Sequence, residues 1–339
     1  MSSYTRRDFA KLALAMLPAS ALFSSLTTSA RAAETIPAGG KPNSKVRGVQ
    51  IGLNVPYSFG IPTMSGDEII KRCTILGLSG VELRAQPVEL FLGSPVPASV
   101  AARGAADSNE SKANAAKLEA WRLGVSMDQV KQFRAKFEDA GILIEILKVD
   151  NITKMSDEVI DYNFAMAKAL GARAISTEIP RTDKKDAVEQ TRVKDEITRL
   201  GKFADKHQFM VGFHGHTHSS EADFEAATAL AKYNGINLDI GHYIAGGNGD
   251  PVAFIKKHHA RITHVHIKDK KKWDPVTRTE GDNTPFGQGD TPIKEVLRLI
   301  RDNHWPIQAT IEFEYKVPEN STRMAEIAKC VQYCRDALA

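Results

Sequence analysis

The stretch Ile262-Thr-His-Val-His-Ile-Lys-Asp269 is typical of a short β-strand that ends in charged residues. From His264 onward, polar and apolar residues alternate, and alternate side chains of a strand face opposite sides. His264 and His266 therefore share one face, and Lys268 lies just past the predicted end of the strand. The stretch predicts a buried strand that carries reactive side chains at its carboxyl end.

Similar strand-like runs recur along the chain and alternate with helical patterns. Several of the predicted helices stop at a glycine just before the next strand, as is usual in βα units. The predicted strands cover residues 49–53, 80–84, 142–147, 172–178, 209–214, 236–240, 262–267 and 309–313, and the predicted helices cover 66–76, 127–139, 157–170, 187–206, 220–233, 251–259, 292–303 and 319–337. Eight such units predict an α/β fold, a (β/α)₈ TIM barrel over residues 48–339. A doubly wound sheet fits less well, because no glycine-rich phosphate-binding turn follows the first strand.

The second and third predicted strands are far apart in the sequence. Between them, residues 93–124 are rich in Ala, Ser and Asn, which indicates an insertion in the second βα loop. Because these loops form the working face of a barrel, the insertion could be a lid or a substrate wall. A solvated surface helix explains its composition equally well, so both interpretations stay open.

Residues 1–32 have the features of an export signal. The string Thr5-Arg6-Arg7-Asp8-Phe9 resembles the twin-arginine signal, and a short apolar run and a small-x-small cleavage pattern follow it. The apolar run is about 15 residues long, too short and too polar for a stable membrane span. We therefore expect the twin-arginine translocase as a partner during export, a linker over residues 33–47 and a periplasmic mature protein.

Composition and charge narrow the class of function. The chain has 339 residues, of which 42% are hydrophobic and 25% charged, as in soluble globular proteins. Its formal net charge is +4, but residues 1–32 supply +3 of it. The remainder is nearly neutral, so we expect no nucleic-acid partner.

Histidines and carboxylates gather at the predicted carboxyl ends of the strands, where barrels place their active sites. These residues are Glu82, Glu178, His214, His216, His218, Asp239, His242, His264, His266, Lys268, Asp269, Glu312 and Glu314. Imidazole and carboxylate groups from separate strands are the ligands of a catalytic divalent metal ion such as Mn²⁺, Co²⁺, Zn²⁺ or Fe²⁺. The sequence therefore predicts one divalent ion at this end of the barrel.

Four stretches of the chain resemble the xylose-isomerase-like barrels, which include sugar isomerases and epimerases, inosose and dehydroshikimate dehydratases and a DNA-repair endonuclease branch. They are LDIGHY (238–243), HVHIKD (264–269), PFGQGD (285–290) and TIEFE (310–314). The resemblance implies that Asp239, His266 and Glu312 are metal ligands and that His242 and Lys268 line the substrate pocket. Many epimerases of the family place a glutamate ligand on strand five, where this chain has His214.

The fourth ligand is therefore either His214 or Glu178. The His214-Gly-His-Thr-His218 strand end looks more like the sugar dehydratases and keto-glycoside lyases of the family. We interpret His216, Glu178 and His242 as catalytic residues, with His216 as the proton-transfer group, and Glu82 and Lys268 as substrate-binding residues.

The expected function is a metal-dependent sugar isomerase or epimerase that removes a proton next to a carbonyl. Its substrate is expected to be an unphosphorylated sugar or keto-sugar, because no strand end offers an arginine cluster for a phosphate. A keto-glycoside lyase or dehydratase acting by β-elimination and a non-catalytic sugar-binding barrel are the alternatives; a phosphodiesterase on abasic DNA fits the charge and the export poorly. The sequence leaves open whether the chain forms a homo-oligomer.

Overall fold

The computed structural model describes residues 40–96, 109–181 and 186–339, which all belong to one compact unit. The predicted export signal, residues 33–39 of the predicted linker and part of the predicted insertion lie outside the described residues. No helix in the described ranges has the length and apolar character needed to cross a bilayer.

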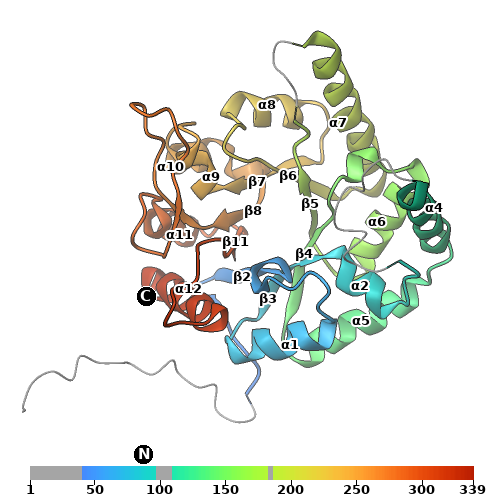
Figure 1. The fold of residues 1–339 in the computed structure, drawn as a ribbon, viewed down its shortest axis with the longest axis horizontal. Helices are drawn as coiled ribbons and strands as arrows, with labels where there is room; N and C mark the ends of the chain where they lie inside the picture. The colour runs from blue at the N-terminus through green and yellow to red at the C-terminus, as the bar shows by residue number, and fades with distance from the viewer. Residues whose placement is uncertain (1–39, 97–108, 182–185) are drawn as a thin grey trace, which may run out of the picture. The chain divides into compact units, whose positions relative to one another are not determined.

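Eight parallel strands close into a barrel, as the sequence predicts (Figure 1). The pairing of the first barrel strand with both the second and the eighth closes the sheet. In barrel order the strands are β2 (Val49–Val55), β3 (Gly80–Arg84), β4 (Leu143–Lys148), β5 (Ala174–Glu178), β6 (Met210–His214), β7 (Asn234–Asp239), β8 (Ile262–Ile267) and β11 (Gln308–Ile311). A short strand, β1 (Lys45–Val46), pairs antiparallel with β2.

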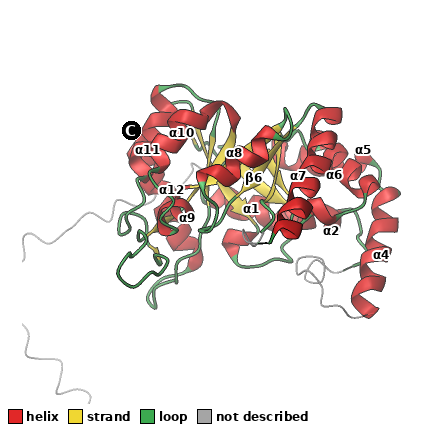
Figure 2. Ribbon diagram, turned by 90° about the horizontal axis from the view of Figure 1, so that it is seen from above, coloured by secondary structure: helices red, strands yellow, loops and turns green. Residues whose placement is uncertain are grey.

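Helices surround the barrel (Figures 1 and 2). Those that follow the predicted pattern are α1 (Gly66–Ile75), α5 (Met127–Asp139), α6 (Asp157–Ala169), α7 (Ala187–His207), α8 (Glu221–Ala229), α10 (Pro251–His258), α11 (Ile293–Asp302) and α12 (Arg323–Leu338). The sequence patterns did not predict α2 (Ala85–Phe91) and α9 (Ile240–Ala245), which are too short for a helical period to stand out.

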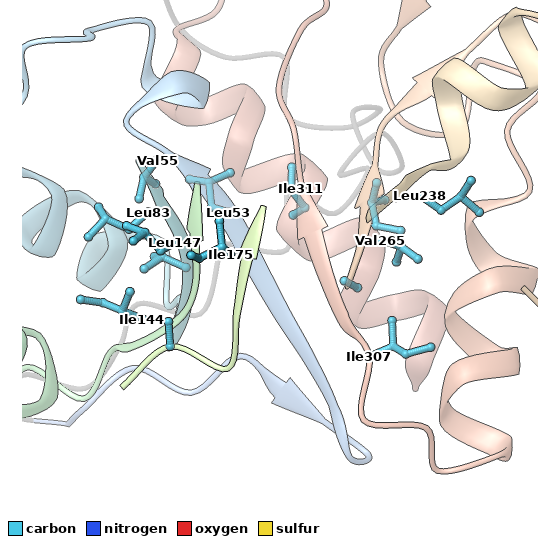
Figure 3. Close-up of a cluster of buried hydrophobic side chains, with 14 of the residues drawn as sticks. Leu53, Val55, Leu83, Ile144, Leu147, Ile175, Leu238, Val265, Ile307 and Ile311 are labelled. Atoms are coloured by element: carbon cyan, nitrogen blue, oxygen red, sulfur yellow. The ribbon is translucent and has the colours of Figure 1, made fainter. Parts of the chain in front are cut away.

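Because side chains alternate along the strands, the barrel has an apolar layer between strands and helices and a polar interior. One set of residues packs outward against the helices and forms the apolar core, and ten of its members are labelled in Figure 3: Leu53, Val55, Leu83, Ile144, Leu147, Ile175, Leu238, Val265, Ile307 and Ile311. The residues between them are polar and equally buried, as with Asn54 on β2, Glu82 on β3 and His266 on β8. The inside of the barrel is therefore a polar chamber that opens at the carboxyl ends of the strands.

The predicted insertion contains a helix, α4 (Asn109–Leu123). Arg122 near its end forms an ion pair with Glu89 of α2, with 2.7 Å between Nε and Oε1, and Glu119 accepts a hydrogen bond from Ser156 at 2.5 Å. Figure 1 shows α4 at the periphery, next to α6. The described part of the insertion thus lies against the outer helices, and residues 97–108 are outside the described ranges.

Asp269 organises the loop that contains the PFGQGD motif. It begins β9 (Asp269–Lys270), which pairs with β10 (Asn283–Thr284). Its carboxylate accepts backbone N–H groups from Gly287 at 2.8 Å, Gly289 at 3.0 Å and Thr291 at 3.2 Å. A Cβ at position 289 would lie 2.0 Å from Asp269 Oδ1, so only glycine permits this approach.

We expect Asp269→Ala to lower the free energy of unfolding by about 1–3 kcal/mol, because buried backbone donors lose their acceptor. Urea unfolding followed by circular dichroism measures this change. Asp302→Ala is the control, since its carboxylate is exposed and its ion pair within the described ranges is with Arg301, and we expect a change within about 0.5 kcal/mol. Equal effects in the two variants would contradict the proposed role of Asp269.

Candidate metal and catalytic site

Four buried side chains, three on barrel strands and one directly after β11, meet at the carboxyl end of the barrel. One ligand atom from each lies within 4.8 Å of the others. We call this the four-residue cluster, and it consists of His214, Asp239, His266 and Glu312. The structure thus brings together the residues that the sequence singles out as ligands, with His214 and not Glu178 in the fourth place.

His266 is held by Glu82 so that one ring nitrogen faces the cluster. Its Nε2 lies 2.5 Å from Glu82 Oε2, while its Nδ1 lies 3.4 Å from Glu312 Oε2 and 3.8 Å from Asp239 Oδ2. Metal-binding histidines commonly donate their other N–H to a carboxylate in this way, which fixes the tautomer. Burial opposes the charged form, but Glu82 and Glu312 raise the pKa of His266 to about 10, so an ion that binds Nδ1 must displace a proton from it.

Glu82 lies deep in the barrel. Its side chain is fully buried, and His264 Nε2 lies 3.3 Å from the oxygen that also faces His266. Despite burial, these two imidazoles hold the pKa of Glu82 well below its usual value. Substrate binding by Glu82 stays a prediction, and its described contacts are with His264 and His266.

The donor set fits a transition-metal ion or zinc. Among the described residues, two buried nitrogens of the cluster make no hydrogen bond: His214 Nδ1 and His266 Nδ1, the second of which lies 3.4 Å from Glu312 Oε2. Unpaired buried polar atoms are costly unless a ligand satisfies them. Two imidazoles and two carboxylates are the mixture that Zn²⁺, Mn²⁺, Fe²⁺ and Co²⁺ accept.

Lys268 places an ammonium group beside the carboxylates. Its Nζ lies 2.5 Å from Glu312 Oε2, 2.7 Å from Glu314 Oε2 and 2.9 Å from Asp239 Oδ2. Burial alone would lower the pKa of Lys268, but these three carboxylates raise it well above its usual value. Glu314 in turn accepts a hydrogen bond from the Tyr57 hydroxyl at 2.7 Å.

On one side of the cluster, His216 faces a carboxylate. Its Nε2 lies 3.4 Å from Glu178 Oε2, and the other oxygen of Glu178 lies 2.6 Å from Lys148 Nζ. The His216 side chain is 35% exposed, compared with 3% for His214, so His216 can reach a bound substrate. Burial opposes the charge on Lys148, but Glu178 raises the pKa of this lysine.

On the other side, His242 faces a cation. Its Nε2 lies 3.1 Å from Lys268 Nζ, while its Nδ1 is buried and has no hydrogen-bond partner among the described residues. Burial and the charge of Lys268 lower the pKa of His242 to about 2. His216 faces a carboxylate and His242 faces an ammonium group, although only 5.0 Å separates the centroids of the two rings.

Two residues of the site were not predicted because the predicted strands stop short of the observed ends, by two residues in β2 and by one in β4. Asn54 lies on β2 just after the predicted end at residue 53, and its Nδ2 donates to Glu312 Oε1 at 2.8 Å. Lys148 is the last residue of β4, whose predicted end was residue 147. Predicted strands that continued to the observed ends would have placed Asn54 and Lys148 at the mouth of the barrel.

A comparison with protein families decides the relationship. The model of the xylose isomerase-like TIM barrel matches residues 115–334. The chain belongs to that family. This membership confirms the resemblance that the sequence motifs indicated.

Curated relatives and solved structures agree with the family. An inosose dehydratase of Clostridium tetani is 25% identical over 159 residues, which cover 42% of this chain and 53% of that protein. The match thus spans about half the length of the relative. The probable 3-DHS dehydratase AsbF of Bacillus anthracis has a TM-score of 0.59 at 16% identity, over 84% of this chain and 98% of AsbF. The IOLI protein, solved with a bound zinc atom, has a TM-score of 0.58 at 16% identity over 86% of this chain and 98% of its own.

Proposed function

We propose that this member of the xylose isomerase-like TIM barrel family is a metal-dependent lyase that acts on an unphosphorylated keto-sugar or keto-glycoside. The observation that carries the proposal is the pair of histidines beside the four-residue cluster, one facing a carboxylate and the other a cation. Such a pair supplies a proton acceptor and a proton donor next to each other, with 5.0 Å between the ring centroids. The dehydratases among the relatives support elimination over the isomerase or epimerase outcome that the sequence alone favoured.

The four-residue cluster would hold the divalent ion. An ion bound there would polarise the substrate carbonyl and stabilise the negative charge that forms on its oxygen. Glu82 orients His266 toward the ion, and Asn54 orients Glu312. These contacts keep the ligand atoms in place before substrate arrives.

His216 is the group that removes the proton next to the carbonyl. With Nε2 turned to Glu178, its Nδ1 is left to accept a proton, and the nearby carboxylate stabilises the imidazolium that results. Lys148 holds Glu178 in place through the 2.6 Å contact. The electron pair of the broken C–H bond then forms a double bond to the neighbouring carbon, whose C–O bond breaks.

His242 gives the departing oxygen its proton. Its Nε2 accepts a hydrogen bond from Lys268, so the proton of the neutral ring lies on Nδ1, which has no partner among the described residues. Donation from Nδ1 to the leaving oxygen and transfer from Lys268 to Nε2 would balance the proton count. Isomerisation and epimerisation share the first step with elimination and differ in where the proton returns.

Product analysis in heavy water separates these outcomes. The manganese-loaded protein is incubated with a panel of keto-sugars and keto-glycosides, and products are followed by NMR. We expect release of the group on the carbon after the one that loses its proton, and deuterium next to the carbonyl in substrate recovered before the reaction is complete. Rearranged sugar without any released group would establish an isomerase or epimerase, and no exchange with any compound would reject proton abstraction altogether.

We also propose that residues 1–32 direct export to the periplasm by the twin-arginine route. Replacing both Arg6 and Arg7 with lysine is expected to hold the precursor in the cytoplasm, because this route recognises the arginine pair. Cell fractionation and immunoblotting measure the distribution. Arg31→Lys is the matched control and should be exported normally; normal export of the double variant by this route would contradict the proposal.

A further inference from the structure

A cavity of about 320 Å³ continues from the candidate site toward α7. His214 and His216 line its inner end, together with Glu178. The rest is lined by residues that follow β4, β5 and β6 and by α7, among them Lys154, Arg181, His218 and Arg192. The volume lies at the lower end of the range for ligand pockets, roughly 300–1,000 Å³, so the cavity suits one ring-sized group.

The charges of the lining residues are not balanced. Glu178 is paired with Lys148, and Arg192 is paired with Glu189 at 2.7 Å and also with Glu196. By contrast, among the described residues no carboxylate lies within ion-pairing distance, 4.0 Å, of Lys154 or Arg181. Four cations, Lys148, Lys154, Arg181 and Arg192, stand against three carboxylates, Glu178, Glu189 and Glu196, so the described residues around the cavity carry an excess of one positive charge.

The position of Arg181 connects it to the site. Arg181 and His218 line the same cavity, and burial and next the charge of Arg181 lower the pKa of His218. His218 in turn packs near His216, with 6.1 Å between the ring centroids. A substrate whose reacting carbon lies at His216 would therefore extend its next group toward Arg181 and Lys154.

We propose that this cavity is a subsite for a carboxylate carried on the part of the substrate remote from the reacting carbon. The inference deepens the proposed function, on which it rests for the orientation of the substrate. A planar guanidinium binds a carboxylate through two parallel hydrogen bonds, and a lysine nearby adds a third donor. The substrate class is then an acidic keto-sugar or a keto-glycoside with an acidic substituent.

Binding of compounds that cannot react tests the subsite independently of catalysis. Isothermal titration compares a methyl hexopyranoside with the methyl hexuronide that differs from it only by a carboxylate at C6, and with the 6-phosphate. We expect the hexuronide to bind about 10–100-fold more tightly than the neutral hexoside, as for charge-assisted hydrogen bonds in a partly buried site. The preference should shrink as the salt concentration rises.

Two variants and one control test whether Arg181 and Lys154 cause the preference for the hexuronide over the neutral hexoside. Arg181→Gln and Lys154→Gln should each reduce it about tenfold and leave the affinity for the neutral hexoside unchanged. Lys45→Gln, an exposed lysine on β1 at the opposite end of the barrel, should change neither affinity. A hexuronide that binds no more tightly than the hexoside would overturn the subsite, as would a preference that survives in both variants.

The phosphate compound separates the two anion chemistries. Tighter binding of the 6-phosphate than of the hexuronide would overturn the assignment to a carboxylate. None of these compounds has a ketone, so failure of the proposed elimination reaction would be seen only in the heavy-water experiment. The two proposals can therefore fail separately.

Discussion

His216→Ala is expected to lower turnover by roughly 10²–10⁴-fold while the divalent ion stays bound, which is the usual contribution of a positioned general base. His216 faces Glu178 and is exposed at the barrel mouth, whereas His214 beside it is buried in the four-residue cluster. Loss of the His216 ring therefore removes a proton acceptor and no predicted ligand. The rate of deuterium entry into a keto-sugar that the wild type accepts measures the effect, and metal analysis checks occupancy.

His259→Ala is the matched control. This histidine stacks on Trp305 outside the barrel, with 4.3 Å between the ring centroids, and its loss should leave turnover unchanged. Exchange at the wild-type rate in His216→Ala would show that another group, Glu178 or His242, takes the proton. Loss of the ion from His216→Ala would instead place His216 among the ligands.

Asp239→Asn and Glu312→Gln are each expected to weaken binding of a divalent ion by at least 10–100-fold, because even residues that only orient ligands contribute this much. Both carboxylates are buried in the four-residue cluster. Titration of the metal-free protein with Mn²⁺ or Zn²⁺ measures the affinity directly and requires no substrate. Glu295→Gln, an exposed carboxylate on α11, is the control.

Full occupancy in both variants would place the ion elsewhere in the protein. Weaker binding in Glu312→Gln alone would point to a smaller set that lacks Asp239. Because Lys268 contacts both carboxylates, folding of each variant is checked by thermal unfolding before titration.

The sequence predicts the barrel well because its signals are local. Alternation along 262–267 and glycines at helix ends act within a few residues, and each predicted strand overlaps one barrel strand. The family model supports the same fold. The predicted strands stopped before Asn54 and Lys148, because a polar residue after an apolar run does not show whether the strand continues to pair with its neighbours.

Contacts between strands are harder to predict from sequence. Glu82 and His266 are 184 residues apart, and their contact depends on the register of β3 and β8 around a closed barrel. Strand alternation shows that both face inward, but their depth depends on strand tilt and stagger. For this reason the sequence places Glu82 in the site but does not identify His266 as its partner. It also does not predict that a carboxylate faces His216 and an ammonium group faces His242.

Lys268 has a consequence for the choice among cations. Its ammonium lies against Asp239, Glu312 and Glu314, so part of their negative charge is already balanced within the protein. Ions that rely on carboxylate charge and oxygen ligands, such as Ca²⁺ and Mg²⁺, then gain less from this site. Ions that also bind imidazole nitrogen gain from His214 and His266 regardless of that balance. The Lys268 ammonium is thus expected to lower the affinity of the site for Ca²⁺ and Mg²⁺ relative to its affinity for ions that also bind imidazole nitrogen.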